Sequence, residues 1–72
     1  MIKKSVVIAN RHQTSISLEE EFLSELQQIA QEQQISLNEL ITRIDSEREQ
    51  HNLSSAIRVY ILHYLKSKNA RF

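Results

Sequence analysis

Apolar residues recur at helical spacing in three separate stretches of the chain, about residues 19–33, 37–48 and 53–67. An apolar residue at every third or fourth position places one stripe of a helix against a core. In the first stretch the stripe consists of Phe22, Leu26, Ile29 and Ala30. In the second stretch it consists of Leu37, Leu40, Ile41 and Ile44. The pattern therefore predicts three amphipathic helices.

The boundary between the first two predicted helices carries its own signals. Ser36 and Glu39 stand three positions apart ahead of an apolar run, which is the spacing of a capping box at a helix N-terminus. The chain contains no glycine and no proline, so the turn before Ser36 is made without either. We expect Gln33 or Gln34 to adopt the left-handed conformation that ends a helix, at a cost of about 1 kcal/mol.

The segment ahead of the helices, residues 11–18, alternates between polar and apolar residues. Alternation indicates a strand, with Thr14, Ile16 and Leu18 on one face. The opposite face is polar and consists of Arg11, Gln13, Ser15 and Ser17. A lone strand leaves its backbone donors and acceptors unpaired, so the pattern predicts that the same strand of a second copy pairs with it. The resulting ribbon has the dimensions to enter the major groove of DNA.

The third predicted helix has a broader apolar stripe than the other two. Its apolar residues are Leu53, Ala56, Ile57, Val59, Tyr60, Ile61, Leu62, Tyr64 and Leu65. The two preceding helices offer too little surface to cover a stripe of this width. We therefore expect this helix to pack on the partner subunit or on a higher oligomer.

The length of the chain, 72 residues, allows one domain, which we take as residues 1–72. A core of this size seldom supplies more than about 3 to 5 kcal/mol of net stability by itself. The chain has no cysteine and no Cys/His spacing of the kind that structural zinc uses. Association with a second copy is the remaining means of stabilisation.

The charges are segregated along the chain, although nine basic and nine acidic residues cancel. Residues 1–13 carry only basic charges, residues 14–49 hold all the acids, and residues 50–72 are again purely basic. A dimer with paired N-terminal strands gathers about six positive charges on one surface, which favours binding to nucleic acid.

Several classes of function lack support in the sequence. His12, His51 and His63 have no metal-ligand spacing, and no nucleophile stands beside a candidate base. We therefore expect no metal, no cofactor and no enzymatic activity. No apolar run approaches the roughly 20 residues that span a bilayer, and the apolar run at residues 6–9 is too short for a signal peptide. The expected location is the cytoplasm.

The order of strand, helix, short turn and capped helix resembles the ribbon-helix-helix superfamily, the fold of the Arc and methionine repressors. The resemblance is carried by T-S-I-S-L-E at residues 14–19, F-L-S-E-L-Q-Q-I-A at 22–30 and I-S-L-N-E-L-I at 35–41. Two further motifs, I-D-S-E-R at 44–48 and N-L-S-S-A-I-R-V at 52–59, are similar to a bacterial subfamily with an extra C-terminal helix. The implied fold class is mainly α, with one N-terminal strand that pairs across a homodimer, two core helices and a third C-terminal helix.

The resemblance implies a dimeric, sequence-specific DNA-binding transcriptional regulator, such as a repressor, and it assigns roles by position. The residues expected to contact bases are Arg11, Gln13, Ser15 and Ser17. The start of the second helix is expected to hold a phosphate on its free backbone N–H groups. The expected phosphate contacts are Lys3, Lys4, Ser36, Leu37 and Asn38. The expected dimer core comprises Ile16, Leu18, Phe22, Leu26, Leu40, Ile41 and Ile44.

A second function is also consistent with the sequence. In this alternative the chain is a protein-interaction module, such as an antitoxin-like adaptor, that holds a partner protein through residues 53–67, and its DNA binding is weak or absent. The zero net charge favours this alternative, as does the lack of a basic residue at Gln13. The same helix could instead support a tetramer.

Overall fold

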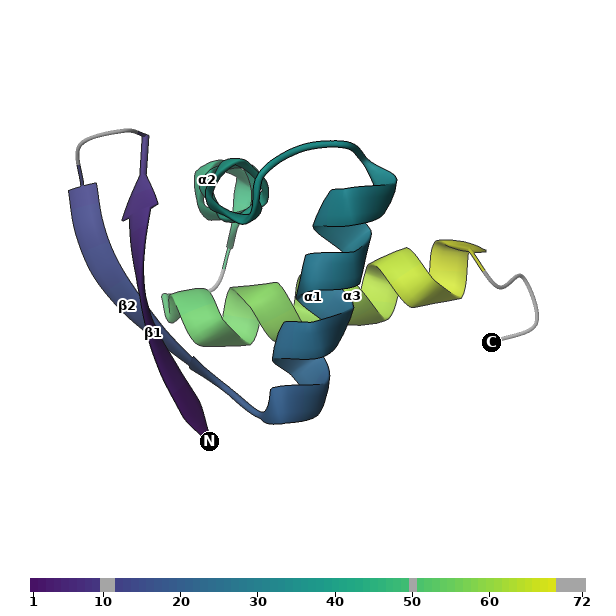
Figure 1. Ribbon diagram of the computed structural model, residues 1–72, viewed down its shortest axis with the longest axis horizontal. Coiled ribbons are helices and arrows are strands. Elements are labelled where there is room, and N and C mark those ends of the chain that lie inside the picture. The colour runs from purple at the N-terminus through teal and green to yellow at the C-terminus, as the bar shows by residue number, and fades with distance from the viewer. Residues whose placement is uncertain (10–11, 50, 69–72) are drawn as a thin grey trace.

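The structure is a computed structural model that describes residues 1–9, 12–49 and 51–68. Its elements in chain order are β1 (Ile2–Ile8), β2 (His12–Leu18), α1 (Glu20–Glu32), α2 (Leu37–Glu47) and α3 (Leu53–Lys68). The two strands form one antiparallel sheet, and all three helices lie on the same side of it (Figure 1). The order of elements and the additional C-terminal helix agree with the expected mainly α fold class.

The expectation of a lone strand is wrong, because β2 pairs with β1 of its own chain. The register runs from Ile2 opposite Leu18 to Ile8 opposite His12. Burial explains why β1 forms, since the side chains of Val6 and Ile8 enter the core with exposures of only 2% and 7%. The ribbon is thus already two-stranded within one chain.

One hydrophobic core lies between the sheet and the three helices. Its buried members are Val6, Ile8, Ile16, Leu18, Leu26, Ile29, Ala30, Leu40, Ile41, Ile44, Ala56, Ile57 and Ile61. Phe22 is partly buried and packs against this core. All the residues expected in a dimer core therefore pack within a single chain, and their place at an interface stays a prediction.

The expectation that α3 needs a partner subunit to cover its apolar stripe is wrong for most of that stripe. Ile57 and Ile61 lie in the core of their own chain, and Tyr60 and Tyr64 pack against that core. Among the described residues of α3, Leu62 is the most exposed large apolar side chain, with 46% of its surface exposed. The candidate surface for a partner is therefore a narrow ridge around Leu62.

The turn between α1 and α2 has the conformation that the sequence predicts. Gln34 is left-handed, with a φ of 58°, and the backbone N–H of Ile35 donates to the carbonyl of Ala30 at 3.0 Å. Ser36 caps α2, because its Oγ accepts from the backbone N–H of Glu39 at 3.0 Å.

The left-handed conformation of Gln34 makes a prediction about stability. Because a side chain with a Cβ costs roughly 1 to 2 kcal/mol there and glycine does not, Gln34→Gly should raise the free energy of unfolding by about 0.5 to 1 kcal/mol. The matched control is Gln33→Gly, at a right-handed position with a φ of −87°, which should lower it instead. Urea denaturation measures both, and equal effects of the two substitutions would contradict the prediction.

Candidate nucleic-acid interface

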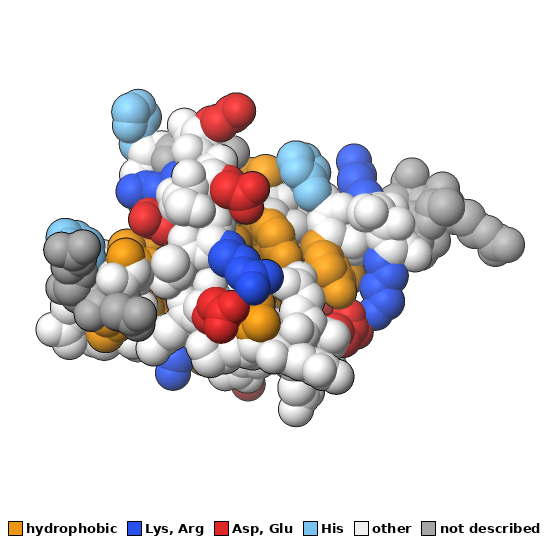
Figure 2. Space-filling view, turned by 90° about the horizontal axis from the view of Figure 1, so that it is seen from above, with side chains coloured by type: hydrophobic (Ala, Val, Ile, Leu, Met, Phe, Trp, Pro, Cys, Tyr) orange, Lys and Arg blue, Asp and Glu red, His pale blue; other side chains and the backbone are white. Residues whose placement is uncertain are grey.

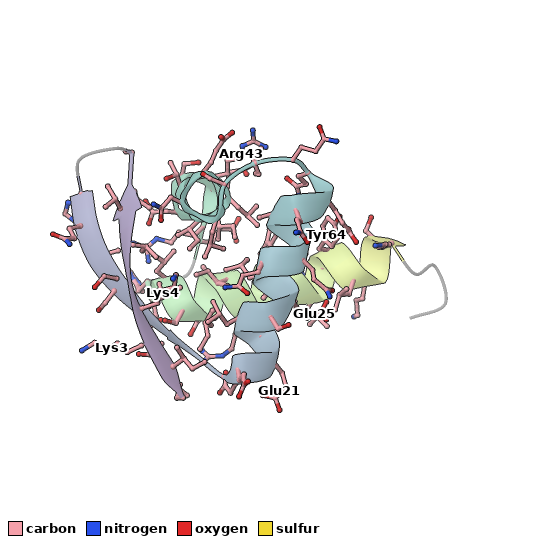
Figure 3. The ribbon with its side chains drawn as sticks, in the orientation of Figure 1. Lys3, Lys4, Glu21, Glu25, Arg43 and Tyr64 are labelled. Atoms are coloured by element: carbon pink, nitrogen blue, oxygen red, sulfur yellow. The ribbon has the colours of Figure 1, made fainter. Side chains whose placement is uncertain are left out.

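The side of the sheet that faces away from the helices, here called the outer face, is almost entirely polar. Its cross-strand pairs are Lys3 with Ser17, Ser5 with Ser15, and Val7 with Gln13. Ser17 is half-buried, and the other five side chains are exposed. Figure 3 shows Lys3 extending from this face away from the helices. The outer face therefore presents hydrogen-bonding groups on a two-stranded ribbon that no described helix obstructs.

The free edge of β2 is held in place at one end by α3. The backbone N–H of Ser17 donates to Ser54 Oγ at 3.0 Å, and Arg58 Nη2 donates to the carbonyl of Ser17 at 3.2 Å. Both bonds point away from β1, so the alternation of a strand turns the backbone groups of Gln13 and Ser15 away from β1 as well. Within the described part of the chain, the backbone groups that these two residues turn away from β1 have no hydrogen-bond partner, and the two side chains stand on the outer face.

The N-terminus of α2 lies beside the opposite edge of the ribbon. The backbone N–H of Ala9 donates to Thr42 Oγ1 at 3.2 Å, which ties the end of β1 to α2. Val7 and Ala9 share a hollow of about 280 Å³ with residues of α2 and its cap, namely Ser36, Asn38, Glu39 and Thr42. Val7, which stands opposite the predicted base contact Gln13, therefore borders the predicted phosphate contacts Ser36 and Asn38.

The backbone at the start of α2 can hold an anion. The N–H groups of Leu37 and Asn38 have no acceptor among the residues that the structure describes, and they stand at the positive end of the helix dipole. Glu39 adds a carboxylate nearby, but Arg43 neutralises it through a 2.8 Å ion pair on the exposed surface of α2 (Figure 3). The local charge is thus compatible with a phosphate.

The two N-terminal lysines fall on opposite sides of the sheet. Lys3 is on the outer face, whereas Lys4 stands opposite the core residue Ile16 and points toward the side that carries the helices (Figure 3). Neither lysine has an ion-pair partner in the described part of the chain. Lys3 is therefore the better placed of the two to contact a phosphate beside the ribbon. Arg11, the remaining predicted base contact, lies outside the described residues.

Arg58 joins three elements within the chain. Its Nε donates to Glu19 Oε1 at 3.0 Å, and its guanidinium lies 5.9 Å from the centre of the Phe22 ring. A backbone hydrogen bond of Glu19 itself, followed by the bond from Arg58, lowers the pKa of the Glu19 carboxyl. The guanidinium of Arg58 thus forms contacts within the chain that stabilise the fold, although the residue belongs to the purely basic stretch 50–72.

A second ion pair ties the end of α1 to the end of α3. Lys68 Nζ and Tyr64 Oη both donate to the carboxylate of Glu32 at 2.7 Å. The hydrogen bond from Lys68 and then that from Tyr64 lower the pKa of Glu32, and the same contact with Glu32 raises the pKa of Lys68. With Arg58 and Lys68 paired internally, the basic C-terminal stretch offers fewer charges to a polyanion than its sequence indicates.

A hollow of about 660 Å³ borders the free edge of β2 and the start of α3. His12, His51 and Asp45 line it, and Arg48 pairs with Asp45 at 2.9 Å. Among the described residues, no three His, Cys, Asp or Glu side chains gather closely enough to hold a metal ion. None of the three described helices is long and apolar enough to cross a membrane.

A comparison with families of known proteins identifies the fold. The family model described as "Ribbon-helix-helix domain" matches residues 1–65. The chain belongs to the ribbon-helix-helix family. Domains of this family are generally DNA-binding regulators without enzymatic activity, and they typically form dimers that bind DNA. Neither the curated proteins nor the solved structures gave a match to this ribbon-helix-helix chain.

The sequence analysis did not predict that Ser5 and Val7 would lie on the outer face, because it expected one strand at residues 11–18 and did not expect β1. Ser5 and Val7 stand directly opposite Ser15 and Gln13. The run Val6-Val7-Ile8 is β-branched and is a strand signal. The usual hairpin signal is absent, however, since no glycine follows the run and Ala9 takes the left-handed conformation, with a φ of 54°.

The Glu32 ion pair predicts how stability depends on pH. Because folding lowers the pKa of Glu32 below its ordinary value of 4.5, its stabilising contribution is complete above that value and is lost as the pH falls through the lowered one. Glu32→Gln should therefore be less stable than the parent chain at pH 6, and the difference should narrow by pH 3. Thermal unfolding at both pH values measures it. Glu47→Gln is the matched control, because it removes an exposed carboxylate that forms no ion pair with the described residues. A Glu32→Gln difference that stays constant with pH would contradict the prediction.

Proposed function

We propose that the chain is a sequence-specific regulator of transcription that binds double-stranded DNA through the outer face of its β1–β2 ribbon. The observation that carries this proposal is the juxtaposition of an uncovered, polar two-stranded ribbon with the free N-terminus of α2. Such a ribbon fits the major groove of B-DNA, which is about 12 Å wide and about 8.5 Å deep. In this proposal the chain lies in a bacterial cytoplasm, and it acts as a repressor because it binds over a promoter.

In this proposal the roles of the outer-face side chains follow from their chemistry. Gln13 forms two hydrogen bonds with adenine, and Ser15 bonds to a base edge beside it. Ser17 makes a smaller contribution, because α3 half-buries it. Arg11 contacts guanine, as the sequence predicts. The phosphate between these bases and α2 is held by the N–H groups of Leu37 and Asn38, with Ser36 at the cap, and Lys3 contacts a second phosphate.

Because β2 pairs with β1 of its own chain, a dimer must be built differently from the one that the sequence predicts. Neighbouring strands lie about 4.8 Å apart, so pairing β2 with β2 of a second copy makes a sheet of four strands about 14 Å across. Such a sheet is wider than the major groove, whose width is about 12 Å. We therefore propose that each chain inserts its own hairpin and that the homodimer contact lies away from the sheet.

The α3 ridge is the surface that we propose for this contact. Leu62 is 46% exposed and Val59 is half-buried, and the two are three positions apart on the solvent side of α3. An antiparallel two-fold pair of α3 helices centred between them sets Val59 against Leu62 of the partner subunit. Figure 2, the view from above, shows hydrophobic side chains at the middle of one face of the molecule, bordered by acidic and basic ones. The ridge is short, so the expected dimer dissociates on dilution.

Charge supports the same arrangement. Between α2 and α3 lies a hollow of about 270 Å³ whose lining includes Glu47 and Glu49 together with Arg48. In an antiparallel pair, the exposed Lys66 of the partner subunit approaches the two carboxylates. The same two-fold contact also sets two hairpins apart from each other, one for each half of an operator.

A second candidate function is a protein-interaction module that uses the α3 ridge to hold a different protein. The internal pairing of Arg58 and Lys68 favours it, because it leaves less positive charge for DNA. A tetramer through α3 is the corresponding alternative for self-association. The two candidates differ in one measurable property, which is whether the purified chain binds duplex DNA.

The DNA-binding proposal predicts distinct effects for two kinds of contact. Lys3→Ala should weaken binding to all duplexes and reduce the slope of log affinity against log salt by about 1, because it removes one phosphate contact. Lys4→Ala, the matched control on the other side of the sheet, should change the slope less. Gln13→Ala should weaken binding to the preferred site about tenfold and leave other duplexes unaffected. Electrophoretic retardation of duplex DNA at several salt concentrations measures these effects. The proposal is contradicted if none of the three substitutions changes the affinity for DNA.

The dimer proposal predicts that Leu62→Glu yields a monomer, because it places a charge at the centre of the α3 contact. Analytical ultracentrifugation over a range of concentrations measures the change. Ser15→Pro serves as the matched variant, since the Ser15 N–H points away from β1 and its loss blocks only pairing at the β2 edge. A dimer that survives Leu62→Glu and is lost in Ser15→Pro would assign the contact to the β2 edge instead.

A further inference from the structure

Val7 is the single apolar side chain among the six strand residues of the outer face. Its neighbours Val6 and Ile8 are buried, whereas 38% of the surface of Val7 is exposed. The core therefore accounts for the residues on either side of Val7 but not for Val7 itself. An apolar side chain near the hairpin end of an otherwise polar face, which we propose to contact DNA, calls for an apolar feature on the DNA.

Val7 stands directly opposite Gln13 on the neighbouring strand. The bonds of Ser17 to Ser54 and Arg58 show which backbone groups of β2 point away from β1, and by alternation Gln13 belongs to the same set. Val7 and Gln13 are therefore a non-hydrogen-bonded pair, in which the Cα atoms approach to about 4.5 Å and the side chains stand close together. The amide of Gln13 has no hydrogen-bond partner in the described part of the chain, so the pair faces solvent as one unit.

The pair also lies next to the proposed phosphate site. Val7 borders the hollow that it shares with Ser36 and Asn38, at the N-terminus of α2. A phosphate held there fixes the position of the adjoining base pairs relative to Val7 and Gln13. The register of the ribbon on the DNA is thus set at the point where this pair stands.

An A·T base pair offers complementary groups on a single edge. In the major groove, adenine presents the N7 acceptor and the N6 donor that a glutamine amide matches with two hydrogen bonds, and its thymine partner presents a C5 methyl group. A G·C pair has no methyl group, and it presents the N4 donor of cytosine, which loses its water against a valine without gaining an acceptor.

We propose that Val7 and Gln13 act together as an A·T reader, with Gln13 bonded to adenine and Val7 packed on the thymine methyl. This inference rests on the proposed DNA-binding function and deepens it. It adds a specificity-determining residue from β1, and it states the base pair that the operator carries next to the phosphate held by α2.

Deoxyuridine provides a direct test, because it differs from thymidine only in lacking the C5 methyl group. The preferred site of the full-length chain is first selected from a random duplex library, and each thymine of that site is then replaced by deoxyuridine in turn. At one thymine the replacement should weaken binding of the parent chain about three- to fivefold, the effect of one buried methyl group. The Val7→Ser variant should bind the two duplexes equally well. Ser5→Ala, from the same strand and face, is the matched control and should keep the parental response.

The outcomes separate this inference from the function on which it rests. If the parent chain binds no duplex of the library, both proposals are overturned. The role of Val7 is overturned, and DNA binding is left intact, in either of two cases. In the first, the parent chain binds a specific sequence but no deoxyuridine replacement weakens its binding. In the second, the replacement weakens binding of Val7→Ser as much as binding of the parent chain. Loss of the response in Val7→Ser alone, together with unchanged binding to non-preferred duplexes and unchanged circular dichroism, supports the inference.

Discussion

Backbone hydrogen bonding is the constraint on which the rest of this structure depends. A strand must find a partner for its N–H and C=O groups, and β2 finds it in β1 of the same chain. This pairing sends Val6 and Ile8 into the core, and it leaves Lys3, Ser5 and Val7 on the other side. The separation of a core face from a polar outer face thus follows from one hairpin register.

The ribbon is then attached to the helices at both of its edges. Ala9 is bonded to Thr42 of α2, and Ser17 is bonded to Ser54 and Arg58 of α3. These bonds cover the ends of the edges, where unpaired strand groups otherwise invite pairing with other chains. They also hold the N-terminus of α2 at a set place relative to the outer face, which brings the proposed phosphate site and the proposed base-reading surface together.

The fold distributes the charges of this neutral chain unevenly between its helical side and the outer face. Arg58 forms an ion pair with Glu19, and Lys68 forms an ion pair with Glu32. Both ion pairs lie on the helical side of the molecule. Lys3 remains on the outer face, where binding depends on the local field rather than on the net charge. In the function that we propose, specificity comes from the side chains of the ribbon.

Features that arise within a few residues were readable from the sequence. The helical stripes, the cap at Ser36 and the left-handed residue at Gln34 depend on spacing and on local backbone sterics, and the structure has each of them. The polar set of Gln13, Ser15 and Ser17 also follows from alternation alone, and it forms the β2 half of the candidate site.

Only the tertiary structure decided which partner each element has. The sequence did not show that β1 would pair with β2, because a β-branched run without a glycine turn is an ambiguous signal. Nor did it show that α3 would be covered by its own chain, or that Arg58 would bond to Glu19 and Ser17, 39 and 41 positions away. Such contacts depend on where the shared core brings distant side chains together, and local periodicity carries no information on that.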